Sequence, residues 1–153
     1  MSILIRFLCE VHDEPEIAVA MGQIVLGDFV EEFEMILGTW NRERYERQWA
    51  EGIQRLLDGA SKSCLISSFW GDKSKFGGEW WRMYRVKDEV VIQNQLIRPD
   101  IFDRHFENFD PDNPYASIPE RRSTNNDGQS ISEWFVPFTQ VTPWSPVHHN
   151  LLA

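Results

Sequence analysis

Histidine and cysteine side chains are the first candidates for chemistry in this chain of 153 residues, because they bind metals and serve as bases or nucleophiles. The sequence contains six of them, which are Cys9, His12, Cys64, His105, His148 and His149. None belongs to a Cys-x-x-Cys or Cys/His cluster with the spacing of a metal site. His12 beside Asp13 and Glu14 could ligate a divalent ion, and a solvated loop is the alternative that we favour. We therefore expect two buried free thiols, no metal and no cofactor.

Glycine-rich segments are the next candidates, since the backbone amides of a glycine loop that precedes a helix can hold phosphate. Gly71 and the pair Gly77-Gly78 flank a segment between two expected strands, and no Lys-Ser or Lys-Thr pair follows them. They are typical of turn glycines. Because no nucleophile, base or carboxylate pair stands in a catalytic setting, we predict that the protein is not an enzyme. A small enzyme with an unrecognised site near His105 is the alternative.

Acidic residues dominate the charge of the chain. Asp and Glu number 24 against 15 Lys and Arg, which gives a net charge of −9. Eight of the acids lie between Phe7 and Asn41, where no Lys or Arg occurs. The resulting field repels phosphate, so it disfavours a nucleic-acid partner and suits a cationic protein. By itself such a run is usually only a solvated face, and a docking surface for a basic partner is the alternative.

Tryptophan is the other unusual feature, with seven residues in one small chain. Trp80 and Trp81 are adjacent in an expected strand, so their side chains point to opposite faces of a sheet and cannot fill the same core. Some tryptophans are therefore expected near the surface, where Trp is a common anchor of protein interfaces. Burial in a first and a second core is the alternative.

One amphipathic helix is expected at about residues 41–58. Asn41 suits the N-cap of this helix, and Gly59 suits the position after its last turn. Tyr45, Trp49 and Ile53 recur every four residues, which predicts a stripe that faces a core. We assign this helix a scaffold role and no chemistry.

Alternating hydrophobicity predicts strands on both sides of the helix. The expected strands are 1–9, 23–27, 32–37, 63–70, 79–86 and 90–97, followed by a hairpin of 120–124 and 130–136. Glu32 and Glu34 alternate with apolar residues and are expected to face solvent, and Asp127-Gly128 suits a hairpin turn. The predicted fold class is α+β, with antiparallel β-sheets and one main helix.

The chain is expected to form one domain over residues 1–153. Between Pro99 and Pro119 four prolines predict a loop with a short helix near 103–108, and residues 143–153 are expected to form an irregular tail. No segment has the roughly 20 apolar residues of a membrane span, and the start has no basic leader or cleavage site. These features predict a cytoplasmic protein.

Three segments together resemble the immunity proteins of contact-dependent growth inhibition systems. They are Trp40-Asn41 with Tyr45, Trp49 and Leu56, the strand Val91-Ile-Gln-Asn-Gln-Leu-Ile97, and Glu120-Arg-Arg-Ser-Thr124 followed by Asp127-Gly128 and Ile131-Ser-Glu-Trp134. The likeness extends over residues 29–136. It is closest to the enterobacterial branch whose toxin domain is a nuclease that attacks small-subunit ribosomal RNA.

This resemblance implies a Whirly-like topology, which single-stranded-DNA-binding proteins share. It also implies that the chain binds the toxin domain at the end of a large secreted exoprotein and neutralises it stoichiometrically, with no membrane or nucleic-acid partner. The acidic charge agrees with this, since a nuclease cleft is lined with Lys and Arg. The alternative is a single-stranded nucleic-acid-binding module, whose basic face would come from Arg82, Arg85, Arg98, Arg121 and Arg122.

The candidate partner-binding residues combine aromatic anchors with carboxylates that can pair with Lys or Arg. The first set follows the helix and consists of Trp70, Asp72, Glu79, Asp127, Glu133 and Trp134. The second set is the acidic strand with Glu31, Glu32 and Glu34. Both a direct plug of the toxin's active cleft and a block from a neighbouring site are compatible with these residues.

Overall fold

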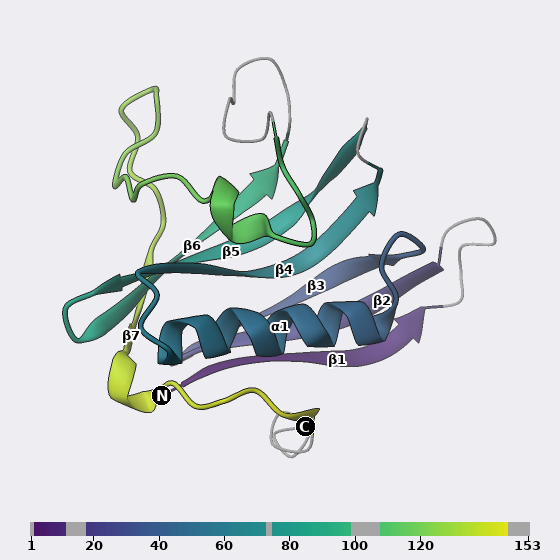
Figure 1. Cartoon of the computed structure of the whole chain (residues 1–153), viewed down its shortest axis with the longest axis horizontal. Helices are drawn as coiled ribbons and strands as arrows, with labels where there is room; N and C mark the ends of the chain where they lie inside the picture. Colours follow the sequence, from purple (N-terminus) through teal and green to yellow (C-terminus); the bar gives the residue numbers. More distant parts are fainter. Residues whose placement is uncertain (1, 12–17, 73–74, 99–107, 147–153) are drawn as a thin grey trace.

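Two antiparallel sheets and one helix make up the computed structural model, which describes residues 2–11, 18–72, 75–98 and 108–146 (Figure 1). The first sheet has the order β1 (Ile3–Val11), β2 (Ala18–Leu26) and β3 (Phe29–Leu37). After helix α1 (Arg42–Leu57), the second sheet has the order β4 (Lys62–Gly71), β5 (Phe76–Val86), β6 (Glu89–Ile97) and β7 (Trp134–Pro137). The predicted α+β class with one main helix is confirmed.

The strands β2 and β3 are longer than the hydrophobic pattern predicts. Their ladder runs from Leu26–Phe29, beside a two-residue turn in which Gly27 has a φ of 63°, to Ala18–Leu37. Gly22 interrupts the apolar alternation of β2, so the hydrophobic pattern does not reveal that the strand begins at Ala18. This glycine lies opposite Phe33, and a Cβ at Gly22 would clash with the Phe33 ring. The missing side chain therefore makes room for an aromatic ring.

The hairpin expected at 120–124 and 130–136 is confirmed only at its turn and not as two paired strands. Among the described residues of this segment, 120–133 form a loop with an isolated bridge between Thr124 and Ser130, although Gly128 has the positive φ of 78° that a turn needs. β7 pairs with β6 instead. Gln93 of β6 donates to the carbonyl of Arg122 at 2.8 Å and to Glu133 at 2.9 Å, so side chains, not a ladder, tie the loop to the sheet.

Several expectations fall on residues that the structure does not describe. They concern His12, His105, His148, His149, most of the short helix at 103–108 and the end of the C-terminal tail. The described part of the long loop contains a short 3-10 helix, η2 (Pro114–Ser117), and another, η3 (Phe138–Gln140), follows β7. Cys64 is buried as expected, whereas Cys9 is exposed, because the register of β1 shifts between Phe7 and Cys9.

Helix α1 begins and ends at its predicted caps. The side chain of Asn41 accepts a hydrogen bond from the Arg44 amide at 2.9 Å, and Gly59 has a φ of 103° and donates to the carbonyl of Leu56. The predicted stripe is fully buried and consists of Tyr45, Trp49, Ile53 and Leu56. In the described ranges of the chain, no helix is long and apolar enough to span a membrane.

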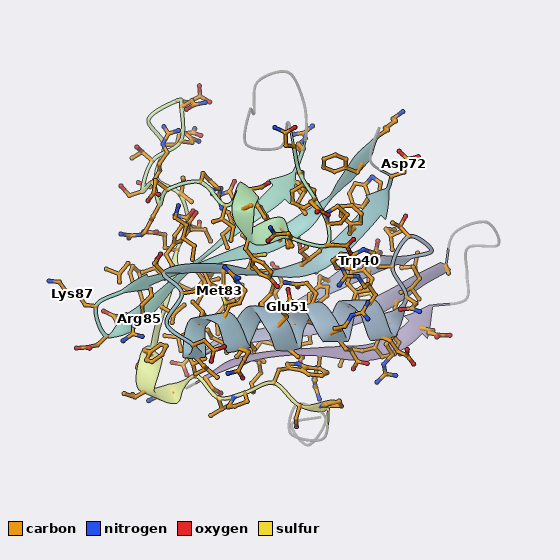
Figure 2. All side chains as sticks on the ribbon, viewed as in Figure 1. Trp40, Glu51, Asp72, Met83, Arg85 and Lys87 are labelled. Carbon is orange, nitrogen blue, oxygen red and sulfur yellow. The ribbon has the colours of Figure 1, made fainter. Side chains whose placement is uncertain are left out.

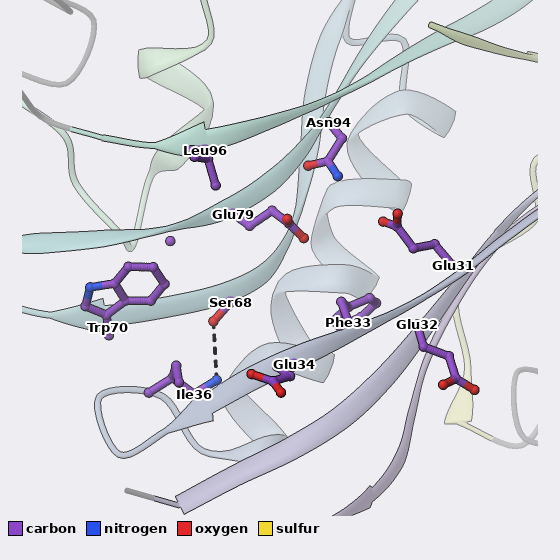
Figure 3. Close-up of a pocket in the computed structure, with 11 residues that line it drawn as sticks. Glu31, Glu32, Phe33, Glu34, Ile36, Ser68, Trp70, Glu79, Asn94 and Leu96 are labelled. Carbon is purple, nitrogen blue, oxygen red and sulfur yellow. Dashed lines mark hydrogen bonds between the residues drawn. The ribbon is translucent and has the colours of Figure 1, made fainter. Parts of the chain in front are cut away.

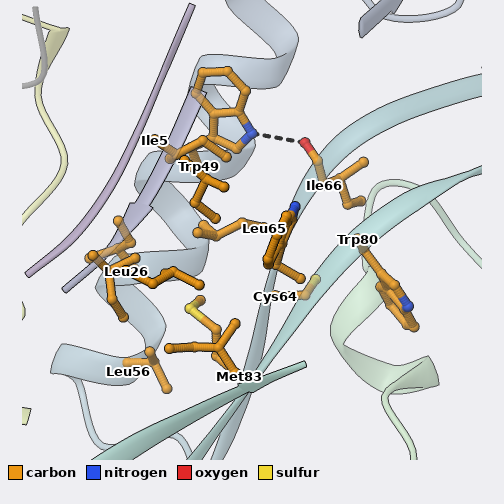
Figure 4. Packing of buried hydrophobic residues seen from close by; sticks show 14 of the residues in the cluster. Ile5, Leu26, Trp49, Leu56, Cys64, Leu65, Ile66, Trp80 and Met83 are labelled. Carbon is orange, nitrogen blue, oxygen red and sulfur yellow. Dashed lines mark hydrogen bonds between the residues drawn. The ribbon is translucent and has the colours of Figure 1, made fainter. Parts of the chain in front are cut away.

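The buried face of α1 forms hydrogen bonds with the outer edge of β4, which no strand of the described residues covers. Gln48 accepts from the Ile66 amide at 2.7 Å and donates to the Cys64 carbonyl at 2.9 Å. The indole of Trp49 donates to the Ile66 carbonyl at 2.8 Å (Figure 4). These side chains replace the strand that β4 lacks on this side, so the backbone of a buried edge is satisfied.

Tyr45 extends this contact to the first sheet. Its hydroxyl donates to the Ile36 carbonyl of β3 at 2.6 Å and accepts from the Phe69 amide of β4 at 2.9 Å. Burial raises the pKa of Tyr45 to about 12, so the hydroxyl keeps the proton that it donates. One hydroxyl therefore joins both sheets to the helix.

Both faces of the second sheet are covered. Trp81 packs against Trp134 with ring centroids 5.5 Å apart, and Trp80 packs on the other face against Phe109, 5.9 Å away. Both indoles are completely buried, which confirms that adjacent tryptophans point to opposite faces and that each has its own core. Side chains fill the space on both sides of the sheet, with Met83 inside and Lys87 at the β5–β6 turn (Figure 2).

We predict that Tyr45→Phe lowers the free energy of unfolding by about 1–3 kcal/mol, because it leaves the partly buried carbonyl of Ile36 and the buried amide of Phe69 without their partner. Chemical denaturation checks this. Tyr84→Phe is the matched control, since the Tyr84 hydroxyl donates to a single carbonyl, that of Pro119. A loss for Tyr45→Phe no larger than for Tyr84→Phe would contradict the joining role of Tyr45.

Candidate functional site

A groove of about 510 Å³ lies between β3 and the second sheet (Figure 3). We call it the acidic groove and define it by four carboxylates and two apolar side chains. These residues are Glu31, Glu32, Glu34, Trp70, Glu79 and Leu96. The structure thus brings together five of the nine residues predicted from the sequence. It joins the acidic strand of the second set to Trp70 and Glu79 of the first set.

Strand alternation sets the directions of the three carboxylates of β3. Glu32 and Glu34 are exposed, as predicted, while Glu31 is half-buried on the inner side. Glu79 of β5 faces the same space from the second sheet (Figure 3). The hydroxyl of Ser67 donates to Glu79 Oε1 at 2.8 Å and holds this carboxylate in place.

The groove is closed at one end by a contact between the sheets. The Ile36 amide of β3 donates to Ser68 Oγ of β4 at 3.3 Å (Figure 3). The carbonyl of Ile36 accepts from the Tyr45 hydroxyl. From this contact the groove extends along β3 towards Glu34 and Glu31. Side chains line the space between the two sheets there, and no strand ladder of the described residues joins them. The hydrogen bonds of Ile36 with Ser68 and with Tyr45 of α1 therefore determine where the groove begins.

Trp70 and Leu96 give the groove an apolar part. Trp70 is 44% exposed and Leu96 is 53% exposed. Trp70 pairs with Gly77 of the neighbouring strand, and a Cβ at Gly77 would come within 2.7 Å of the indole. The ring therefore lies directly on the backbone of β5, and a large aromatic surface remains open to a partner.

The carboxylates of the groove oppose one another electrostatically. Partial burial and the nearby charge of Glu79 together raise the pKa of Glu31 above its usual value of 4.5. Among the described residues that line the groove, none is Lys or Arg. The groove therefore favours a cation, which would relieve the repulsion between Glu31 and Glu79.

Four predicted residues lie outside the groove, and two of them are in turns. Asp72 follows β4 and accepts from the Lys75 amide at 3.1 Å, at the end of the sheet opposite Lys87 (Figure 2). Asp127 is exposed in the turn of residues 125–129. Their role in binding stays a prediction.

The other two, Glu133 and Trp134, make internal contacts. Arg121 donates two hydrogen bonds of 2.8 Å to Glu133, and these bonds, with a third from Gln93, lower the pKa of that carboxyl. Trp134 is half-buried and packs on Phe29 with ring centroids 4.6 Å apart. Both side chains hold the C-terminal loop and β7 on the second sheet, and their contact with a partner also stays a prediction.

The sequence analysis missed Asn94 and Leu96 as groove residues. The run Gln93-Asn94-Gln95 indicates a strand with a polar face, and the structure divides its members between two sides of β6. Gln93 is fully buried and accepts from Arg82 at 3.0 Å, whereas Asn94 lines the groove. The polar run was the available signal, because a polar residue at a strand position must find either a partner or solvent.

Four of the five arginines of the nucleic-acid alternative have partners within the chain. Arg82 donates to Gln93, Arg121 to Glu133, and Arg122 to Asn126. Arg85 donates to the Lys87 carbonyl and lies over the ring of Phe138. These contacts engage the guanidinium groups that a basic groove for single strands would need.

Comparisons with known proteins point to one family. The model of the CdiI N-terminal domain matches residues 35–144. The chain is 28% identical over 131 residues to the immunity protein CdiI of Enterobacter cloacae subsp. cloacae, with 85% of each chain covered. A solved structure, the CdiA-CT/CdiI toxin and immunity complex from Enterobacter cloacae, contains a chain with the same fold. Its TM-score is 0.76 at 24% identity, over 90% of this chain and 91% of that one.

We predict that Glu31→Gln raises the midpoint of thermal unfolding at pH 7. Because the pKa of Glu31 is higher in the folded than in the unfolded chain, ionisation disfavours the folded state, and the stability that the protonated group gives is lost as pH rises through that raised pKa. The difference from the wild type should vanish below about pH 4.5. Glu32→Gln, at an exposed position of the same strand, is the control. Equal midpoints for Glu31→Gln and wild type at pH 7 would contradict the repulsion.

Proposed function

The chain belongs to the CdiI N-terminal domain family, and from this premise we propose that it is an immunity protein of a contact-dependent growth inhibition system. It binds the cognate toxin domain, which forms the C-terminal part of a large secreted exoprotein, and neutralises it by stoichiometric protein–protein inhibition. Its similarity to a chain of a toxin and immunity complex supports this proposal.

The acidic groove is the surface that we propose binds the toxin. It combines four carboxylates with an exposed indole in a chain of net charge −9. An interface needs a desolvated anchor and complementary charges around it, and Trp70 with Glu31, Glu32, Glu34 and Glu79 supplies both. The toxin surface that fits this groove carries Lys and Arg.

A nuclease is the toxin class that this charge fits best. Its active cleft must attract phosphate, so it is lined with basic residues. Opposed fields accelerate association, towards about 10⁸–10⁹ M⁻¹s⁻¹ at low salt. The immunity protein acts in the cytosol of the cell that it protects, and it acts by occupying the toxin without catalysing a reaction.

We predict one-to-one binding between this protein and the toxin domain encoded beside it, with loss of the toxin's activity in the same titration. Calorimetry and an activity assay at low and high salt check this. Glu34→Lys should weaken binding about tenfold or more, mainly through the association rate, because it reverses a charge at the mouth of the groove.

Two matched variants locate the interface. Glu89→Lys reverses an exposed acid at the start of β6, away from the groove, and should leave the affinity within about threefold. Asp127→Lys tests the turn of residues 125–129. A large loss for Asp127→Lys with none for Glu34→Lys would move the interface to the C-terminal loop. No binding by the wild type to a folded, active toxin would contradict the immunity role, and single-stranded DNA would be the next ligand to titrate.

A further inference from the structure

The backbone of β3 has one side that no strand covers. β3 is an edge strand of the first sheet and, among the described residues, pairs only with β2. In an antiparallel pair, alternate residues direct their N–H and C=O towards the partner, and the others direct them away. Ile36 directs them away, since its N–H donates to Ser68 and its C=O accepts from Tyr45. By the same alternation, Val30, Glu32 and Glu34 direct theirs away from β2, and Glu32 and Glu34 line the acidic groove.

Two other sheet edges, those of β4 and β1, are covered by side chains. Gln48 and Trp49 cover β4, and the indole of Trp144 donates to the Ile5 carbonyl of β1 at 2.8 Å. No hydrogen bond that the structure shows within the described ranges reaches the outward N–H and C=O groups of Val30, Glu32 and Glu34. The groove therefore contains a free strand edge about five residues long.

The charges on this edge decide what can pair with it. A free edge is a template for a further strand, and charged side chains on it commonly prevent pairing between identical copies. Glu32 and Glu34 are exposed there, so a second copy of this acidic chain is repelled. The same carboxylates attract a strand that carries Lys or Arg.

We propose that the toxin domain places an extended basic segment in the acidic groove, where the segment pairs with β3 as a fourth strand of the first sheet. Main-chain hydrogen bonds supply affinity in this mode of recognition, and side chains supply specificity. This inference rests on the proposed function and names how the toxin is held.

The groove sets the chemistry of that segment. Its side chains alternate between two faces, one beside Glu32 and Glu34 and the other towards Glu31 and Glu79. Lys or Arg therefore fits on both faces. An Arg near the closed end can also stack on the exposed indole of Trp70, since guanidinium groups bind the faces of aromatic rings.

Amide hydrogen exchange, followed residue by residue by NMR, tests the pairing in the free protein and in its complex with the toxin domain. Exchange at Val30, Glu32 and Glu34 should slow about tenfold or more on binding. Exchange at Glu31 and Phe33 should change little, because their amides already pair with β2. A complex that inhibits the toxin without this alternating protection would overturn the strand pairing and leave the immunity role intact.

A pair of variants at one position separates the contribution of the backbone N–H to toxin affinity from that of the carboxylate. Glu32→Ala and Glu32→Pro both remove the carboxylate, but the proline variant also removes the N–H, and edge strands tolerate proline. Glu32→Pro should bind the toxin about tenfold more weakly than Glu32→Ala. Equal affinities would overturn the proposal. If Glu32→Pro does not fold, the exchange pattern of the wild type still decides.

Two further outcomes have distinct meanings. A dimer of the free protein in sedimentation, with the alternating protection already present, would show that a second copy occupies the edge and would overturn the toxin segment as occupant. Failure of the wild type to bind a folded toxin domain would overturn the proposed function, and with it this inference.

Discussion

The hydrogen bonds between α1 and the uncovered edge of β4 are the interaction on which the rest of the structure depends. Gln48 and Trp49 satisfy the backbone of Cys64 and Ile66, and Tyr45 carries the same contact on to Ile36 of β3. A buried strand edge without such partners would cost the folded state several hydrogen bonds. Because these three residues lie on one face of the helix and bond to both sheets, the helix fixes the distance between them. No ladder among the described strands joins the two sheets.

The acidic groove is a consequence of that arrangement. The sheets are held together at the closed end and remain unpaired beyond Ser68, so the carboxylates of β3 and β5 face each other across a space that no strand of the described chain fills. The electrostatic cost appears in the raised pKa of Glu31. At Glu31 the fold keeps a partly desolvated charge that disfavours the folded state, which is typical of a surface shaped for a partner.

Local signals in the sequence predicted the helix, its caps and most strands. Asn41 and Gly59 determine where the helix ends through backbone geometry that neighbouring residues alone can specify. The hairpin after Glu120 is reduced to its turn and one bridge, because Gln93, far away in the chain, holds the loop by side-chain bonds. The exposure of Trp70 and the partial burial of Trp134 could not be distinguished in advance, since both depend on which sheet face each side chain covers. Periodicity also could not show that Glu31 and Glu79 meet, because that requires the distance between sheets.

The exposed side chains of the groove contribute less to the stability of the fold than the core side chains do. Within the described part of the chain, the side chains of Glu32, Glu34 and Leu96 form no hydrogen bond or ion pair that the structure shows, and all three are largely open to water. Substitutions at such positions usually change stability by less than about 0.5 kcal/mol. Mutational drift can therefore alter which partner the groove accepts in single steps, while the helix and both cores stay as they are. Recognition in this protein is free to evolve faster than its architecture.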